Sequence, residues 1–338
     1  MKQPARIVFH DPRLASVTGG GESLTLQKIE ALDRELFLPV IVTCSGQESR
    51  LFREFRETNP LVEVHKCDAP DETLPDSVDT FLKAHRLESL WGQDDLVDDA
   101  LRFNSVAADI YRELGAELIS VSVLTDLAGL PTAIPRVLHI YGCPPREMAE
   151  AEAPLLDNVR QLSAVSAFIW NRFRETIRHW APLPECRVLP PAVGRAFLEP
   201  PPALGKRNIA FLYAGRLTPR KGVLEMVEAH ARLRDKCGAT SKLAVAGDGP
   251  MREPMEKLAR ELDVAASMAF LGSLGADELA AWMGRSTFFL YPVNKPEAFG
   301  LSPLEAMSRG AIPILGVLGG MAEYAEDRRN SIVVEDID

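Results

Sequence analysis

Short apolar runs alternate with helical patterns along the whole chain, and this alternation constrains the fold more than any other feature. Between the runs, apolar residues recur at helical spacing, as Leu26, Ile29 and Leu32 do. Near-continuous apolar strands separated by helices indicate a parallel sheet that helices cover on both faces. The predicted strands of the first half are Arg6–His10, Pro39–Thr43, Val62–His65, Leu118–Val121, Arg136–Ile140 and Gln161–Val165.

A proline run divides this pattern into two parts. Glu199-Pro200-Pro201-Pro202 can continue neither a helix nor a central strand, and the following Gly205-Lys206-Arg207 extends the break. The sequence therefore predicts an α/β protein with doubly wound domains over residues 1–199 and 208–338, a linker over 200–207, and a ligand-binding cleft between them. The predicted strands of the second domain are Ile209–Ala214, Lys242–Ala246, Ser267–Phe270, Thr287–Leu290, Ile312–Leu315 and Ser331–Val334.

Charge and cysteine content exclude several classes of protein. The formal net charge of −10 argues against a nucleic-acid binder with a broad basic surface. The five cysteines are scattered and show no CxxC spacing, so we expect neither a disulfide framework nor a cysteine zinc site. The first residues lack the apolar run of a signal peptide. We expect a cytoplasmic protein whose acid-rich stretch from Asp68 to Asp99 forms a solvated loop and helix.

The turn after Ile209–Ala214 holds three cations, Arg216, Arg220 and Lys221, directly before a predicted helix. Cationic side chains and the free N–H groups of a helix start both favour an anion, and a diphosphate suits this combination. A basic loop in contact only with solvent is the alternative, because such turns are common on surfaces.

Two carboxylates, Glu297 and Glu305, flank a turn that contains Gly300. The N–H groups of Phe299, Gly300 and Leu301 would be free to meet an anionic or hydroxyl-rich ligand. Spacing leaves two roles open for Glu305, since the run from Ser302 to Glu305 also has the pattern of a capping box with proline at the first helical position. Glu297 has no such alternative and is the better site candidate.

Three features of the first half are less specific. Gly19, Gly20 and Gly21 precede the first helix, where glycine lets the backbone approach a phosphate or a sugar, although glycine clusters also mark surface loops. His139 lies on an apolar strand, where a histidine is more often a core residue than a ligand contact. A basic amphipathic helix follows Ser166; its apolar residues Ile169, Phe173, Ile177 and Trp180 favour core packing over contact with a membrane.

Taken in order, these motifs resemble glycosyltransferase family 4, retaining enzymes of the GT-B fold. The resemblance covers residues 209–334 and rests on the motifs AGRLTPRKG (214–222), AGDGP (246–250), FLG (270–272), the run from Glu297 to Glu305, and GGMAE (319–323). The Gly loop and His139 match the acceptor half of the family less specifically. Pro190-Pro191 stands where the family has a different turn, and family members continue through helices beyond residue 338.

The resemblance implies roles for single residues. Arg216 and Lys221 would hold the diphosphate of a nucleoside-diphosphate sugar, and the backbone of residues 299–301 would meet the sugar and its phosphate. Glu297 would contact the hydroxyls of the transferred sugar, and Glu305 would bind the ribose diol. His139 would lie near the donor sugar, and Gly20 and Gly21 would form the acceptor or phosphate loop.

The reaction implied is transfer of a sugar to an acceptor hydroxyl with retention of anomeric configuration, and the acceptor is a saccharide, a lipid-linked saccharide or a small molecule. Cations and a helix start can stabilise the departing diphosphate, so we expect neither a metal nor a cofactor. Two alternatives remain: a GT-B nucleotide-sugar epimerase, and a non-catalytic nucleotide-binding partner of an active transferase. Contact with a membrane surface is possible but not favoured.

Overall fold

The chain folds into two α/β units, residues Met1–Pro190 and Pro191–Asp338, in a computed structural model. The structure describes residues 3–17, 19–68, 83, 95–143, 153–180, 182–203, 207–237, 241–316 and 318–334. Most of the acid-rich stretch between Asp68 and Asp99 lies outside these residues, so the solvated loop predicted there stays a prediction.

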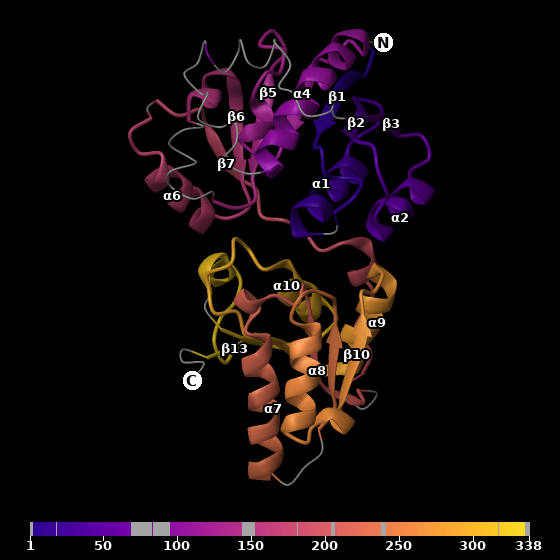
Figure 1. Cartoon of the computed structure of the whole chain (residues 1–338), viewed down its shortest axis with the longest axis vertical. Coiled ribbons are helices and arrows are strands. Elements are labelled where there is room, and N and C mark those ends of the chain that lie inside the picture. Colours follow the sequence, from indigo (N-terminus) through magenta and orange to yellow (C-terminus); the bar gives the residue numbers. More distant parts are fainter. Residues whose placement is uncertain are drawn as a thin grey trace. The chain divides into compact units, whose positions relative to one another are not determined.

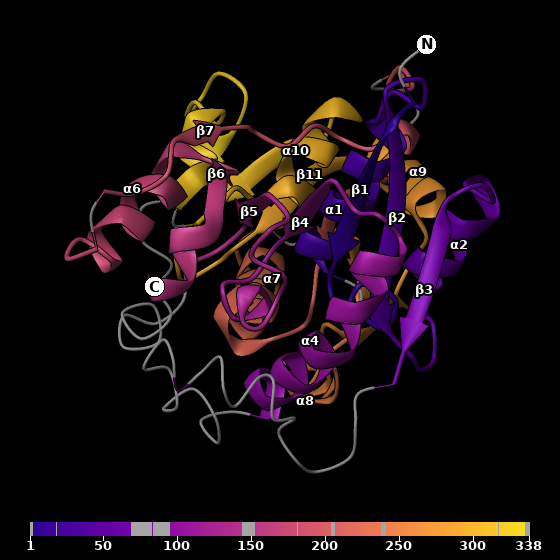
Figure 2. The same cartoon turned by 90° about the horizontal axis from the view of Figure 1, so that it is seen from above.

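The first unit contains one sheet in which every pair of neighbouring strands is parallel. Its strand order is β3-β2-β1-β4-β5-β6-β7, and the strand labels follow this order from right to left in Figure 2. The chain begins in the middle of the sheet and crosses back to β4 to build the other half, as a doubly wound fold requires. The strands are β1 (Ala5–His10), β2 (Phe37–Cys44), β3 (Glu63–Cys67), β4 (Leu118–Val121), β5 (Arg136–Ile140), β6 (Val159–Ala164) and β7 (Cys186–Val188).

Helices of the first unit bury apolar stripes against this sheet. On one face, Leu26 and Ile29 of α1 (Gly20–Ala31) and Phe52 of α2 (Arg50–Thr58) form a cluster with Phe9 and Ile41 of the strands. The other helices in the described part of the unit are α4 (Asp95–Glu113), η2 (Thr125–Leu127), η3 (Ala153–Asn158) and α6 (Ala167–Thr176).

The second unit repeats the architecture with a parallel sheet of order β10-β9-β8-β11-β12-β13. Its strands are β8 (Ile209–Ala214), β9 (Leu243–Ala246), β10 (Met268–Gly272), β11 (Ser286–Tyr291), β12 (Ile312–Leu315) and β13 (Ile332–Val333). Its helices are η4 (Arg195–Phe197), η6 (Pro219–Lys221), α7 (Val223–Cys237), α8 (Arg252–Glu261), η7 (Ala265–Ser267), α9 (Ala276–Arg285), α10 (Leu301–Ser308) and η8 (Gly319–Glu323).

Alternate residues of β8 enter two different cores because successive side chains of a strand point to opposite faces. Leu212 and Ala214 pack with Met283 of α9 and Ala306 of α10. Tyr213 packs on the other face with residues of α7 and α8, two helices that lie side by side in Figure 1. Both faces of the sheet are therefore covered, and the continuous apolar runs of the sequence follow from this.

The residues around the proline run pack on the second unit. Phe197 belongs to its core, and the carbonyls of Phe197 and Glu199 accept hydrogen bonds from Ser308 and Arg309. The guanidinium of Arg207 donates to the carbonyl of Ser286 at 2.9 Å. These residues belong to unit 2, which begins at Pro191.

The predicted α/β class with two parallel sheets is confirmed, and most strands lie within two residues of their predicted bounds. Strand β7 was not predicted; its three residues are too short to show a pattern and are held by pairing with β6. On α6, Ile169, Phe173 and the adjacent Ile177 are buried, as core packing predicts. In the described residues no helix is long and apolar enough to cross a membrane.

Candidate functional site

The cationic turn of the second unit connects β8 to α7. It runs from Gly215 through η6 to Gly222, whose left-handed backbone (φ 63°) ends η6 before α7 begins. A Cβ atom at Gly222 would lie 1.9 Å from the carbonyl oxygen of Pro292. Only glycine fits here, because it tolerates positive φ and leaves room for the neighbouring backbone. The turn therefore packs directly against the loop that follows β11.

This packing brings Lys221 and Glu297 together. The Nζ atom of Lys221 lies 2.9 Å from Oε1 of Glu297 and donates a second hydrogen bond to the hydroxyl of Tyr291 at 2.8 Å. The guanidinium of Arg220 reaches the same Glu297 oxygen at 3.2 Å. Burial lowers the pKa of Lys221, whereas the Glu297 carboxylate acts in the opposite direction and favours the ammonium form. Two cations and a carboxylate thus meet at one point of the second unit.

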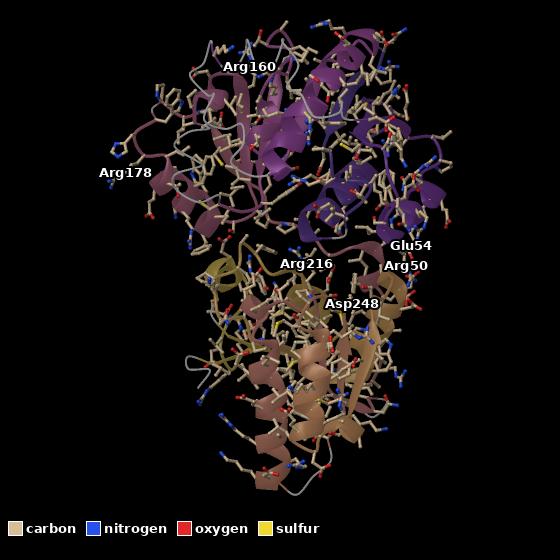
Figure 3. All side chains as sticks on the ribbon, viewed as in Figure 1. Arg50, Glu54, Arg160, Arg178, Arg216 and Asp248 are labelled. Atoms are coloured by element: carbon tan, nitrogen blue, oxygen red, sulfur yellow. The ribbon has the colours of Figure 1, made fainter. Side chains whose placement is uncertain are left out.

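Arg216 lies on the same turn, and its side chain is exposed; the residue is labelled in Figure 3. Its carbonyl accepts a hydrogen bond of 3.1 Å from the hydroxyl of Tyr213, which holds the backbone of the turn. Within the described residues, no side chain or carbonyl hydrogen-bonds to the Arg216 guanidinium. The side chain is therefore available to an anionic ligand.

The AGDGP motif supports the cationic turn from the side of β9. The N–H of Leu217 donates to the carbonyl of Asp248 at 2.9 Å, and the N–H of Met251 donates to Leu217 at 3.0 Å. A Cβ atom at Gly247 would lie 2.0 Å from the carbonyl oxygen of Gly215. The glycines of this motif thus allow close contact between two backbone segments.

Helix α10 begins at Leu301, after Gly300 in the left-handed region (φ 75°, ψ 70°). The capping box considered for Ser302 and Glu305 is wrong: Gly300 occupies the N-cap, Ser302 lies inside the helix, and no side chain caps it. Among the described residues, no acceptor pairs with the N–H groups of Phe299, Gly300, Leu301 or Ser302. They are free to donate to a ligand at the helix start.

Glu305 lies on α10 and is only 8% exposed. In the described part of the chain, no hydrogen-bond donor contacts its carboxyl group. Burial raises the pKa of this carboxyl to about 7, because the charged form loses its hydration without gaining a partner. A buried carboxyl group without a partner at this position is the arrangement that a hydroxyl-rich ligand would complete.

His139 lies on β5 in the first unit, within a polar cluster. Its Nδ1 accepts from the Lys28 ammonium at 2.9 Å and lies 2.5 Å from Ser163 Oγ, and its Nε2 lies 3.0 Å from Ser120 Oγ. Burial and the Lys28 ammonium lower the pKa of His139 to about 3. The imidazole is therefore neutral, and both ring nitrogens have partners within the unit. Its predicted contact with a donor sugar stays a prediction.

The glycine loop forms the start of α1, with Gly19 at the N-cap and Gly20 and Gly21 in the first turn. A Cβ atom at Gly19 would lie 2.5 Å from Oε2 of Glu22, so this carboxylate lies over the helix start. A Cβ atom at Gly21 would lie 3.2 Å from the Tyr141 ring, whereas one at Gly20 would have no neighbour within 4 Å among the described residues. The role of Gly20 and Gly21 as an acceptor or phosphate loop stays a prediction.

Sequence analysis did not single out Tyr213 or Tyr291, and it did not predict the contact of Arg220 with Glu297. Arg220 stood inside the cationic turn, but spacing could not show that it reaches Glu297. Tyr213 and Tyr291 lie at or near the carboxyl ends of β8 and β11, where site residues of parallel sheets gather, and this position was the available signal. In the described residues, no group of three or more His, Cys, Asp or Glu could hold a metal ion.

The fold defines a protein of the GT-B type, with two doubly wound units and a cationic turn on the second. Residues 195–338 match the family Glycosyl transferases group 1. A GDP-mannose-dependent alpha-(1-6)-phosphatidylinositol monomannoside mannosyltransferase of Mycobacterium tuberculosis is 29% identical over 53% of this chain and 49% of its own. Glycogen synthase of the same species is 35% identical over 33% of this chain and 27% of its own.

Solved structures share the fold over nearly the whole chain. The Anabaena protein HepE in complex with UDP and glucose superimposes with a TM-score of 0.74 and 13% identity, covering 98% of this chain and 86% of HepE. Sucrose-phosphate synthase of Thermosynechococcus elongatus gives a TM-score of 0.72 and 15% identity, covering 98% and 87%. The chain has the GT-B fold, and the match of residues 195–338 supports a GT-B glycosyltransferase, with which family 4 is consistent.

The matched region spans about half the length of the mannosyltransferase relatives, 49% and 48% for those of Mycobacterium tuberculosis and Mycolicibacterium smegmatis. Their donors and acceptors are therefore properties of those proteins.

Proposed function

We propose that this protein is a retaining glycosyltransferase that moves a sugar from a nucleoside-diphosphate sugar to an acceptor hydroxyl. The observation that carries the proposal is the meeting of Lys221 with Glu297 beside the free N–H groups at the start of α10. A group that binds diphosphate and a group that binds sugar hydroxyls then lie side by side, as a sugar diphosphate requires. The family match of residues 195–338 and the GDP-mannose-dependent relatives support this assignment.

The cationic turn would stabilise the leaving group. Cleavage of the bond between the sugar and the phosphate leaves negative charge on the diphosphate and positive charge on the sugar ring. Arg216 and Lys221 would bind the diphosphate, with the N–H groups at residues 299–301 as further donors. Charged donors that are already in place stabilise such a charge at little cost in reorganisation, so the proposed reaction proceeds without a metal ion.

The two carboxyl groups would serve the other parts of the donor. Glu297 would accept hydrogen bonds from the hydroxyls of the transferred sugar and oppose the positive charge that develops on the ring. Glu305 would accept from the ribose diol, which supplies the donors that its buried carboxyl lacks. Because both lie on the second unit, one unit would hold the nucleotide and the sugar together.

The first unit would present the acceptor. Gly20 and Gly21, which lack side chains, would let the acceptor approach the protein backbone closely at the start of α1. His139 would lie near the donor sugar. The acceptor is proposed as a hydroxyl of a saccharide, a lipid-linked saccharide or a small molecule. The phosphatidylinositol monomannoside acceptor in the relatives' name supports the lipid-linked class.

Incubation of the purified chain with a panel of UDP- and GDP-sugars tests the proposal. We expect the chain to release nucleoside diphosphate, and we expect an acceptor to accelerate this release. The release should persist with EDTA, and NMR should show that the product keeps the donor's anomeric configuration. Substitution of Lys221 or Arg216 by alanine should remove turnover without unfolding the chain. Unchanged transfer by both variants would overturn the diphosphate assignment.

The same assay separates the two alternatives. An epimerase would convert the donor to an isomeric sugar nucleotide or sugar without any acceptor. A non-catalytic partner would bind UDP or GDP in calorimetry and release no sugar from any donor. Either result would replace the transferase proposal.

A further inference from the structure

Two carbonyl groups of the loop before α10 are held by the segment that contains η8. The N–H of Gly320 donates to the carbonyl of Glu297 at 2.8 Å. The hydroxyl of Tyr324, directly after η8, donates to the carbonyl of Gly300 at 2.6 Å. The loop that carries the free N–H groups is thus attached at both ends to one neighbouring segment.

Gly300 needs such an attachment because glycine has no side chain that could restrain its backbone. Its φ of 75° lies in the left-handed region, and a Cβ atom there would lie 2.6 Å from Cγ of Met321. The position therefore accepts only glycine, the residue with the greatest backbone freedom. A hydrogen bond from outside the loop supplies the restraint that a side chain cannot.

The hydrogen bond to Gly300 also sets the direction of the next N–H. The carbonyl of Gly300 and the N–H of Leu301 belong to one planar trans peptide, so they point in opposite directions. With the carbonyl held by Tyr324, the N–H of Leu301 points away from Tyr324. This N–H has no partner among the described residues and belongs to the set proposed to meet the donor phosphate.

We propose that Tyr324 is a positioning residue of the donor site, acting through the peptide between Gly300 and Leu301. The proposal rests on the function proposed above. The centroid of the Tyr324 ring lies 5.2 Å from that of Phe299. The ring therefore packs against Phe299, while the hydroxyl orients the peptide between Gly300 and Leu301. Burial and the neighbouring Glu297 carboxylate raise the pKa of the Tyr324 hydroxyl well above its ordinary value, so it remains a donor.

The variant Tyr324→Phe keeps the ring and removes only the hydroxyl. We expect its affinity for UDP or GDP to fall about fivefold, the effect of roughly one hydrogen bond, while its affinity for UMP or GMP changes by less than about twofold. A purely structural effect would lower the affinities for the monophosphate and for the diphosphate alike. Tyr111→Phe is the matched control, because it removes a buried tyrosine hydroxyl that contacts His10 in the first unit. Calorimetry of the full chain measures these affinities.

Equal loss for mono- and diphosphate, or no loss for either, would overturn the positioning role. A wild-type chain that binds no nucleotide would refute the proposed function instead. The peptide orientation is then tested on the ligand-free protein by NMR. We expect Tyr324→Phe to shift the Leu301 amide resonance and to accelerate its hydrogen exchange, whereas Tyr111→Phe should leave both unchanged. An unaltered Leu301 amide in Tyr324→Phe would also overturn the positioning role.

Discussion

The ammonium of Lys221 lies 2.9 Å from the carboxylate of Glu297, although 76 positions separate the two residues in the chain. Both side chains are largely buried, with 13% and 14% of their surface exposed. An ion pair of this kind loses hydration on folding, and removal of one partner leaves an uncompensated charge. Lys221 lies on the turn that also carries Arg216 and Arg220, so the Glu297 carboxylate offsets part of a concentrated positive charge.

Removal of either charge should reveal strong coupling between the two residues. We expect a double-mutant cycle with Lys221→Met and Glu297→Gln to give an interaction energy of about 1–3 kcal/mol in urea unfolding. The matched control is the exposed pair Arg50 and Glu54 on α2, visible in Figure 3, whose side chains are 49% and 42% exposed. That pair should give about 0.3–0.5 kcal/mol. Equal coupling energies for the two pairs would contradict this prediction.

Alanine at Gly222 should disrupt the contact between the cationic turn and the Pro292 loop. The new Cβ would meet the Pro292 carbonyl at 1.9 Å in a backbone of positive φ, so we expect a loss of about 2 kcal/mol or more in unfolding free energy. Gly20→Ala, in the first turn of α1, is the control, because its Cβ would have no neighbour within 4 Å in the described part of the chain. It should be neutral or slightly stabilising. A Gly222→Ala variant as stable as Gly20→Ala would show that the turn can move freely.

Glu305 should make the second unit less stable as the pH rises. Its pKa is about 7 in the folded chain against 4.5 for the ordinary carboxyl, so the folded state binds the proton more tightly. Stability is then lost between those two values, and above pH 7 the loss reaches up to about 3 kcal/mol. Glu305→Gln should remove this dependence and be the more stable protein at pH 8. Parallel pH profiles for the two proteins, measured by urea unfolding, would contradict the prediction.

Nucleotide binding should show the opposite preference at Glu305. Ribose hydroxyls donate to a carboxylate better than to a neutral carboxyl, so we expect UDP or GDP affinity to rise between pH 6 and pH 8. The diphosphate itself titrates in this range, and Glu305→Gln supplies the correction. Isothermal calorimetry of both proteins at each pH gives the difference. If the wild-type and Glu305→Gln affinities keep a constant ratio, Glu305 does not bind the ribose.

His139 should remain neutral throughout the physiological range. Because the Lys28 ammonium donates to Nδ1, the ring proton should reside on Nε2, and with a pKa of about 3 the ring should not titrate between pH 8 and pH 5. Nitrogen-15 NMR of the imidazole reports both properties. Lys28→Met should raise the pKa, because it removes a nearby positive charge. A wild-type midpoint near that of free imidazole would refute this account.

Local patterns were sufficient for most of the fold. The strands Leu118–Val121, Arg136–Ile140, Ile209–Ala214 and Ile312–Leu315 have the bounds that their apolar runs predicted. Most residues of these strands are buried or half-buried, and Ile312 at the start of its strand is exposed, so burial acts along nearly the whole run and leaves an almost continuous apolar signal. At α10 the local pattern suggested a wrong helix start, because Ser302 and Glu305 have the spacing of a capping box. The helix begins earlier, after Gly300, whose carbonyl is held by Tyr324 and whose Cα lies close to Met321.

The sequence by itself determined the α/β class, the two parallel sheets and the turn on which Arg216 and Lys221 lie, because these depend on neighbours in the chain. Only the tertiary structure decided that Lys221 contacts Glu297 and Tyr291 and that Tyr324 holds Gly300. It also decided that Glu305 is buried, with no hydrogen-bond donor on its carboxyl group among the described residues. Such contacts depend on how two loops pack at a sheet edge. A displacement of a few ångströms makes or breaks a hydrogen bond, and residue spacing does not carry that information.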